Sequence, residues 1–508
     1  MTFARWMTVL CLTLFLSGLL GCSRTSEAVP KGPLEVRLDA EGPTLILATQ
    51  GAADAYGEAM DIARRLHPGA GEGIVDPADP AWTAAILQEH RPRYALVFIL
   101  PDELDVNFAW RWLTISSEVD EDPFVDVRTG FITGETPEAA AAFMKRIAEA
   151  ASGGLSLPGL LVDNLGPNAM AQKDAFDETP KSFFLPAYEG RMGLKTISHG
   201  TQGFTRERMD SMAGAGLVHL GGHGYPDRIV DGLNGPWVRK LSLSPCVVFN
   251  GACYTGVTGR WFETMGTVRE QNVPPQESFC LGILGNQAVG YLAALHPDHG
   301  IPVYQEMEFL AFEGASLGDV MKHTHDGVIL AGGGQPPEFE VLADGLGALS
   351  WTPAEYMLKG TAARVLFGDP ALVPMKAFSG APFETALARS PDGAWTLTAT
   401  LRNDALKATF TDTYYSDMSA VPNQFNDRAR LAVELPENLS SVASVEVLRA
   451  EASGKSLKHR LVGWAVEEDA GKRILHVQVD VPTTAYMESE FRHEGAQLEL
   501  KLTATDSP

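Results

Sequence analysis

Two side chains of complementary chemistry follow two apolar segments in the middle of the chain. Residues 217–220 (LVHL) lead into His223-Gly224, and residues 246–249 (CVVF) lead into Ala252-Cys253. An imidazole can hold a thiol in its reactive state and protonate a leaving amine, which is what a cysteine nucleophile requires of its partner. The pair could therefore perform nucleophilic catalysis by a thiol. The alternative is a structural histidine in a glycine-rich turn and a buried thiol.

The elements around this pair must bring the two side chains together. The apolar segments have the character of short buried strands, and the residues between them suffice for a crossover connection. If the strands are neighbours in a parallel sheet, His223 and Cys253 emerge at the same carboxyl edge. Gly224 and the backbone around Cys253 leave room for amide N–H groups to approach a developing oxyanion.

The other cysteines and histidines fit packing better than chemistry. Cys246 and Cys280 lie inside apolar strand patterns, and His219 alternates within its strand, so we expect all three in the core. A second His-Gly pair, at His199, follows residues 195–198 (KTIS), which form a poor apolar strand.

Metal chemistry has little support in the sequence. At a spacing of two residues, His323 and His325 point to different faces of a helix. No third metal ligand is evident for this pair or for His296 and His299, so we expect no catalytic metal. The acidic run over residues 118–122 (EVDED) fits a solvated loop or a structural calcium site.

Composition limits the classes of protein that remain. The chain has 508 residues, 45% of them hydrophobic, and a formal charge of −24. The apolar content can bury a substantial core, which excludes a wholly disordered chain. The acidic surface repels phosphate backbones, which argues against nucleic-acid binding. Only three of the five cysteines lie beyond residue 30, so there is no disulfide framework.

The first thirty residues are typical of an export signal. Arg5 precedes an apolar run, and residues 19–22 (LLGC) resemble the bacterial lipobox. In that interpretation residues 1–21 are removed, Cys22 is acylated, and residues 22–40 form a tether to the membrane. Ser23 favours the outer membrane, at its periplasmic face or at the cell surface. The alternative is an ordinary signal peptide.

Periodicity divides the remaining chain into three parts. Over residues 41–185 strand-like runs alternate with helical patterns, and over 186–378 short buried strands are each followed by a glycine-rich loop. Both patterns predict an α/β fold with a mostly parallel sheet and helices on both faces, in two subdomains. Over 390–508 the period changes to two, which predicts an all-β, immunoglobulin-like sandwich. Residues 378–393 are expected to form a linker.

These motifs together resemble the caspase-like clan of cysteine peptidases, and within it the gingipain family. An apolar block ending in His-Gly, a spacer and an apolar block ending in Ala-Cys are the clan's signature. Three further segments are similar to gingipains in the same order: Asp122–Gly134 with the helix at Pro137, Ala288–Leu292, and Leu366–Leu372 (LFGDPAL). The resemblance spans residues 90–376, and it implies a caspase-like catalytic subdomain over 186–378.

The resemblance also implies roles for the site residues. His223 would be the general acid/base, Cys253 the nucleophile, and the backbone N–H groups of Gly224 and Cys253 the oxyanion hole. The implied reaction is hydrolysis of peptide bonds in protein or peptide substrates through a thioester. Gingipain-like proteins carry structural calcium, but their catalysis requires no cofactor.

A carboxylate that would give a preference for Arg or Lys cannot be aligned from the sequence. Candidates on loops that could reach the site are Asp174, Asp177, Asp227 and Asp298, and the loop 293–299, which contains His296, could wall the pocket. A preference for basic residues stays open.

Two other functions stay open beside a lipid-anchored cysteine endopeptidase. One is a catalytically weak caspase-fold binding or scaffolding lipoprotein. The other is a ligase or acyltransferase that uses the same pair. In each case Cys22 would provide the membrane contact, and the sequence does not indicate the oligomeric state.

Overall fold

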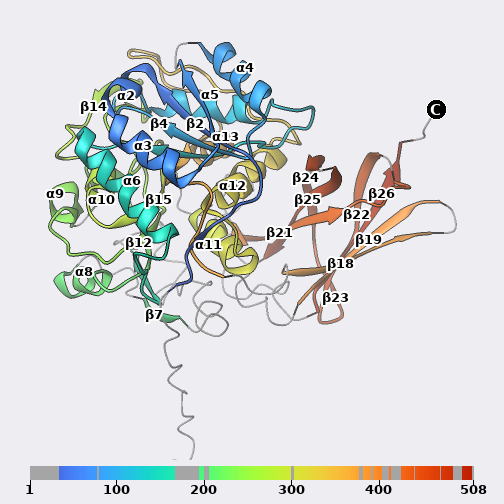
Figure 1. Ribbon diagram of the computed structural model, residues 1–508. Coiled ribbons are helices and arrows are strands. Elements are labelled where there is room, and N and C mark those ends of the chain that lie inside the picture. Colours follow the sequence, from blue (N-terminus) through green and yellow to red (C-terminus); the bar gives the residue numbers. More distant parts are fainter. Residues whose placement is uncertain are drawn as a thin grey trace, which may run out of the picture.

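The computed structural model describes residues 34–76, 79–165, 194–198, 205–230, 232–298, 302–376, 382–390, 393–402, 411–412, 425–439, 441–469, 471–483 and 495–505. These residues form an α/β body and a separate pair of β-sheets beside it (Figure 1). The predicted signal, Cys22 and residues 22–33 of the predicted tether, as well as Asp174, Asp177, His199 and His299, lie outside the described residues, whereas residues 34–40 of the tether are described and include a short strand at Arg37–Leu38.

A ten-stranded sheet runs through the α/β body. In spatial order its strands are β3 (Gly71–Val75), β2 (Thr44–Thr49), β4 (Tyr94–Phe98), β5 (Arg128–Ile132), β16 (Arg364–Gly368), β15 (Ala288–Ala294), β12 (Cys246–Asn250), β8 (Leu217–Gly221), β6 (Leu160–Leu165) and β7 (Lys195–Ser198). All residues of β4, β8, β12, β15 and β16 are buried, because helices cover both faces of the sheet.

The sheet consists of two parallel halves that run in opposite directions. The pairs from β3 to β16 are parallel, as are those from β15 to β7, whereas β15 and β16 are antiparallel. The neighbours β8 and β12 therefore end at the same edge, as the sequence predicts. Because Ala294 at the end of β15 pairs with Arg364 at the start of β16, Arg364 lies at this edge too.

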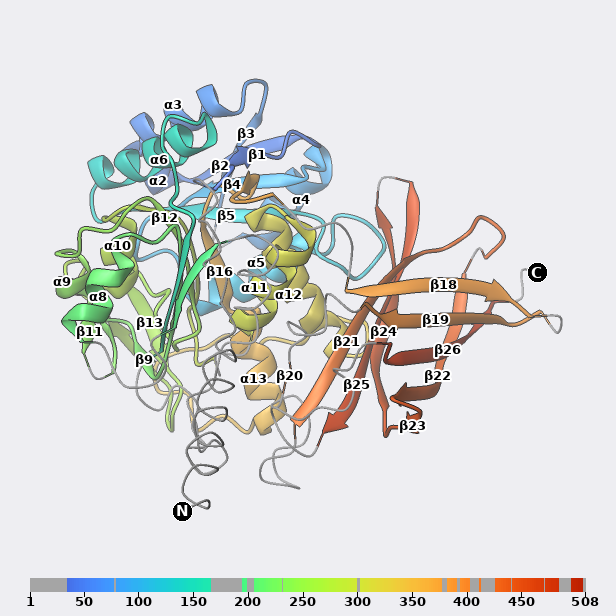
Figure 2. The same ribbon diagram turned by 90° about the horizontal axis from the view of Figure 1, so that it is seen from below.

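The helices form two layers. They are α2 (Gln50–Ala55), α3 (Gly57–Leu66), α4 (Pro80–His90), α5 (Val106–Ser116), α6 (Pro137–Ala151), α8 (Arg206–Met212), α9 (Gly235–Val238), α10 (Phe279–Leu284), α11 (Pro302–Glu313), α12 (Leu317–Ala331) and α13 (Pro353–Ala362). Figure 2 shows α3 and α6 on one side of the sheet and α5, α11 and α12 on the other. The helix predicted at Thr136-Pro137 begins there, with the Thr136 side chain accepting a hydrogen bond from the Ala139 N–H.

Three small sheets complete the body. They are β1 (Arg37–Leu38) with β17 (Leu372–Val373); β9 (Gly224–Tyr225), β10 (Arg228–Ile229) and β11 (Leu233–Asn234); and β13 (Arg260–Glu263) with β14 (Arg269–Asn272). The strand β9 begins directly after His223, so a hairpin extends from the histidine loop. In the Phe-Gly-Asp-Pro motif, Asp369 is fully buried and contacts His67 Nε2 at 2.6 Å, which ties the end of β16 to α3.

The C-terminal part is a β-sandwich with its own core. One sheet contains β18 (Phe383–Arg389), β19 (Trp395–Leu401), β26 (Gln497–Ala504), β22 (Val442–Ala452) and β23 (Lys455–Ser456). The other contains β20 (Thr411–Asp412), β21 (Phe425–Glu434), β25 (Lys472–Thr483) and β24 (Arg460–Asp469). Alternate residues of β19 are buried, which explains the period of two in its sequence.

The predicted fold class is confirmed: a mostly parallel α/β sheet precedes an all-β sandwich. The linker expected over 378–393 is wrong for residues 383–389, which form the edge strand β18; most of its side chains are exposed, so it lacks a clear apolar alternation. The subdomain boundaries stay predictions. The strand β6 lies before the predicted boundary at residue 185, but it pairs with β8, which lies after it. Among the described residues, no helix is long and apolar enough to cross a membrane.

Candidate active site

The loops that carry His223 and Cys253 lie against each other at the edge of the sheet. Their strands pair in parallel, with Val247 opposite Leu217 and Asn250 opposite Leu220. A Cβ atom added to Gly224 would lie 2.3 Å from the carbonyl oxygen of Cys253 and 2.9 Å from its nitrogen. Only glycine permits this approach, so the glycine of the His-Gly pair is what brings the two loops together.

The thiol of Cys253 is half-buried and surrounded by main-chain groups. Sγ lies 2.9 Å from the carbonyl oxygen of Asp298, to which it donates, and 3.3 Å from the Asp298 N–H, from which it accepts. The N–H groups of Gly224 and of Cys253 itself lie close enough to the thiol to lower its pKa. These two groups are the donors that the family resemblance implies for the oxyanion hole.

The pKa of the Cys253 thiol is raised to about 11. Burial is the main cause and the charge of Asp298 adds to it, while the surrounding N–H groups act in the opposite direction. The group is therefore a neutral thiol at pH 7.

His223 is exposed at the mouth of this arrangement. Its main chain is fixed, because its carbonyl oxygen accepts from the Val230 N–H at 2.8 Å. Among the contacts of the described residues, none is a hydrogen bond between the imidazole and Cys253. The imidazole is exposed, and catalytic hydrogen bonds often form only once substrate is bound.

A hydrogen-bond network fixes the turn before and after Cys253. Asn250 accepts from the Ala252 N–H at 2.8 Å and donates to the Tyr291 hydroxyl at 2.9 Å, which in turn donates to the carbonyl of Thr255 at 2.8 Å. Tyr254 has a φ of 59°, a left-handed conformation that is uncommon for a non-glycine residue and that clusters at functional sites. The sequence predicted the cysteine but not this support.

Arg364 is a residue of the site that sequence reasoning missed. It is fully buried and donates to the carbonyl of Asn250 at 3.0 Å, to both carboxylate oxygens of Glu306 at 2.6 and 2.8 Å, and to the carboxylate of Asp298. It thereby joins the strand before Cys253, the loop that contacts Sγ, and α11. A single arginine in the apolar run 362–367 (AARVLF) was the only signal, because such a charge needs a buried partner.

The acidic residues proposed for the specificity pocket have partners of their own. The Asp298 carboxylate is buried and paired with Arg364, and Asp227 lies 2.7 Å from Arg228. His296 is fully buried, and burial lowers its pKa to about 3. Neither carboxylate is thus held ready for a basic substrate side chain.

The residues expected in the core are there. Cys246 and Cys280 are fully buried, although Cys280 lies in α10 rather than in a strand. His219 is buried and contacts Asp163 at 2.7 Å. His323 stacks on Phe309, with ring centroids 4.1 Å apart, whereas His325 Nε2 lies 3.1 Å from the carbonyl oxygen of Arg364. The two histidines therefore face different neighbours, as their spacing predicts.

The acidic loop gathers three carboxylates, Asp120, Asp122 and Asp126, with oxygen atoms within 4.8 Å of one another. Burial raises the pKa of Asp122 to about 6 and that of Asp126 to about 7, from an ordinary 3.8. The charges of the nearby carboxylates add to this effect. The pKa values of Asp122 and Asp126 in the folded chain lie above those of the unfolded chain. The contribution of these two carboxyl groups to the free energy of unfolding therefore falls as the pH rises from 4 to 7.

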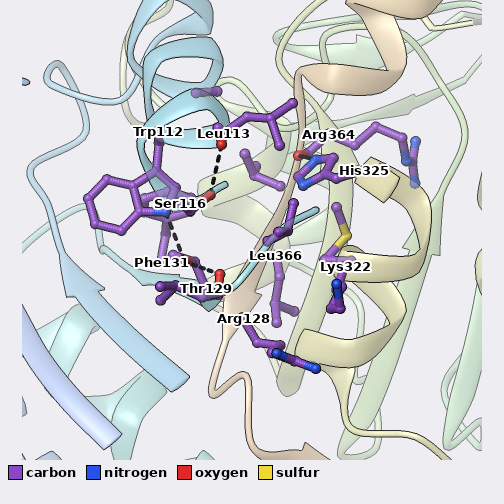
Figure 3. A pocket seen from close by; sticks show the side chains of 15 residues that line it. Trp112, Leu113, Ser116, Arg128, Thr129, Phe131, Lys322, His325, Arg364 and Leu366 are labelled. Carbon is purple, nitrogen blue, oxygen red and sulfur yellow. Dashed lines mark hydrogen bonds between the residues drawn. The ribbon is translucent and has the colours of Figure 1, made fainter. Parts of the chain in front are cut away.

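A cavity of about 30 Å³ between α5, β5, α12 and β16 is too small for a substrate. Figure 3 shows it between Trp112 on one side and Lys322 and His325 on the other. It has room for about one water molecule.

Replacing Gly224 by alanine is expected to reduce kcat/KM for a peptide by about 10²–10³-fold, since the new Cβ forces the Gly224 N–H away from the thiol. Peptide hydrolysis by the purified variant is the measurement. Gly57→Ala is the matched control, because a Cβ there has nothing within 4 Å, and it should keep full activity. Full activity of Gly224→Ala would contradict the placement of this N–H group.

Known proteins of similar structure include two that bear on this site. A structure described as that of a protease has 12% identity and a TM-score of 0.45, over 87% of this chain and 95% of that chain. The arginine-specific cysteine proteinase gingipain R has 12% identity and a TM-score of 0.46, over 77% of this chain and 96% of that chain. No protein-family model and no curated protein sequence matches the chain.

Proposed function

We propose that the chain is a cysteine endopeptidase in which Cys253 is the nucleophile and His223 the general acid/base. The observation that carries the proposal is the pair of N–H groups, from Gly224 and Cys253, that converge on the half-buried thiol beside an exposed histidine. A substrate carbonyl carbon attacked by Sγ would place its oxygen within reach of these donors.

The reaction has two halves. Sγ attacks the carbonyl carbon while its proton passes to His223, and the oxyanion is stabilised by the N–H groups of Gly224 and Cys253. His223 then protonates the leaving amine, the C–N bond breaks, and a thioester to Cys253 remains. Water attacks the thioester and gives its proton to His223, which returns it to the sulfur as the acid product leaves.

The proposal extends to where the enzyme acts. The lipobox-like residues 19–22 and Ser23 support an exported lipoprotein that is anchored through Cys22 in the outer membrane. Labelling of cells with a radioactive fatty acid, in the natural chain and in Cys22→Ala, would test the anchor. Loss of the label in the variant is expected.

The enzymatic proposal can be tested with a peptide library and an alkylating reagent. The purified chain, under reducing conditions, should cleave library peptides, and iodoacetamide should stop cleavage in step with modification of Cys253. Cys246 and Cys280 are fully buried and should remain unmodified in the folded protein. Cleavage that survives complete modification of Cys253 would refute the proposal.

A binding or scaffolding protein is the second candidate, and the state of the thiol favours it. The pKa of about 11 and the hydrogen bond to the Asp298 carbonyl both keep the thiol protonated. If the folded chain bound peptides, cleaved none of them and resisted iodoacetamide at pH 7.5, the binding or scaffolding function would replace the peptidase function.

Calcium binding is a further part of the proposal. The three carboxylates of the acidic loop offer the oxygen ligands that Ca²⁺ prefers, and the charge of the ion would relieve their mutual repulsion. At 100 times its Kd, calcium should stabilise the folded chain at pH 7.5 by about 2.7 kcal/mol. In Asp120→Asn, which keeps an oxygen for the Asp122 N–H, this gain should shrink. Equal thermal stability of the natural chain with calcium and with chelator would contradict the site.

A further inference from the structure

A cluster of aromatic side chains lies beside the thiol. The aromatic wall, as we name it, consists of Trp110, Tyr254, His296, Trp351 and Tyr356. Its rings contact in sequence: centroids lie 5.5 Å apart for Trp110 and His296, 5.2 Å for His296 and Tyr356, and 5.8 Å for Trp351 and Tyr356. The members come from α5, the turn after Cys253, the loop after β15, the segment that leads into α13, and α13 itself, which carries Tyr356.

Thr264 holds the wall together. Its hydroxyl lies 2.9 Å from the hydroxyl of Tyr356, 3.1 Å from Nε2 of His296 and 3.4 Å from the hydroxyl of Tyr254. Thr264 is itself buried, so these polar ends meet inside the protein. The rings are therefore fixed in place rather than free to rotate.

The wall is attached to the nucleophile at two points. Tyr254 follows Cys253 in the chain. His296 lies two residues before Asp298, whose carbonyl and N–H groups both contact Sγ. The Tyr254 ring lies 6.2 Å from the His296 ring, and its hydroxyl is linked to that of Tyr356 through Thr264. The wall thus flanks the thiol on the side of the Asp298 loop.

Only part of the wall can meet a substrate. Trp110, Tyr254 and His296 are buried and support it from behind. Trp351 and Tyr356 are half-buried, so part of each ring reaches the surface. These two rings offer an apolar contact surface next to the thiol.

The cation–π position on the wall is already occupied. Lys359 Nζ lies 4.3 Å from the centroid of the Trp351 ring, so the protein's own cation fills this position. Of the three carboxylates whose charges act on Lys359, Glu340 accepts from Trp351 Nε1 and Glu355 caps α13, while Glu338 is exposed. Asp298 is paired with Arg364.

We propose that Trp351 and Tyr356 bind the substrate side chain nearest the attacked carbonyl, and that they select an aromatic or large aliphatic residue before the scissile bond. This inference rests on the proposed peptidase function. The residue whose carbonyl is attacked carries the side chain closest to the sulfur, and rings fixed beside that sulfur gain from burying apolar surface. The site would thus differ from an arginine-specific one.

Two peptides that differ only in having Phe or Arg before the scissile bond test the inference. The natural chain should have at least a 10-fold higher kcat/KM for the Phe peptide, since even one methylene group in an apolar pocket is worth about 10–200-fold. Trp351→Ala should lower kcat/KM for the Phe peptide by at least 10-fold and leave the Arg peptide almost unchanged. Trp351→Leu, which keeps apolar bulk, should recover part of the loss.

The matched control is Trp82→Ala on α4, where the ring is 55% exposed; it should leave both peptides unaffected. A preference for the Arg peptide, with cleavage lost in Cys253→Ala, would overturn the inference and leave the peptidase function standing. Equal losses for both peptides in Trp351→Ala would overturn it as well, because they would indicate a structural role. Absence of cleavage of any peptide would remove both proposals.

Discussion

Replacing Cys253 by alanine is expected to lower kcat/KM for peptide hydrolysis by at least about 10⁴-fold, because covalent catalysis is lost and only the binding surface and the N–H donors remain. The change removes one sulfur atom from a half-buried position, so folding should be preserved. Peptide hydrolysis and thermal unfolding of the same preparations are the two measurements.

A matched cysteine substitution separates chemistry from packing. Cys280→Ala removes a fully buried sulfur from α10 and should cost some stability while activity is retained. His223→Ala should resemble Cys253→Ala in activity. If Cys280→Ala and Cys253→Ala lost activity to the same extent, the assignment of the nucleophile would fall.

Replacing Arg364 by methionine is expected to lower the free energy of unfolding by about 3–5 kcal/mol, because it leaves the buried carboxylates of Asp298 and Glu306 without their cation. Activity should fall as well, since Arg364 also holds the carbonyl of Asn250 and the loop that contacts Sγ. Denaturant unfolding, followed by tryptophan fluorescence, measures the first effect.

An exposed arginine provides the control for this prediction. Arg64 also pairs with two carboxylates, Asp61 and Glu72, but its side chain is 40% exposed, so Arg64→Met should cost at most about 1 kcal/mol. Adding Glu306→Gln to Arg364→Met should restore part of the stability by removing one uncompensated charge. Equal losses at the two arginines would show that the buried network contributes no more than a surface pair.

The sequence was informative where local pattern decides structure. Apolar runs ending in His-Gly and Ala-Cys predict two buried strands that end at the same edge, and the pairing of β8 with β12 confirms it. The change to a period of two predicts the sandwich. The edge strand β18 was missed because its exposed side chains carry no such period.

The rest of the site could not be predicted because it is assembled from distant segments. Arg364 meets Asn250, Asp298 and Glu306 only because β16 enters the sheet antiparallel to β15, and no local pattern shows that reversal. The aromatic wall likewise depends on Trp351 and Tyr356, far along the chain from Cys253, folding back against His296. The sequence proposes the reacting groups, and the tertiary structure supplies their surroundings.

The thioester is the most direct test of the central claim that Cys253 attacks a peptide carbonyl. The chain would be mixed with an activated peptide ester, quenched in acid within milliseconds, and examined by intact-mass and peptide-mapping mass spectrometry. The account predicts a mass increase equal to one acyl group, located on Cys253 and absent from Cys253→Ala. Hydrolysis of the ester with no acyl group on Cys253 at any time would contradict it.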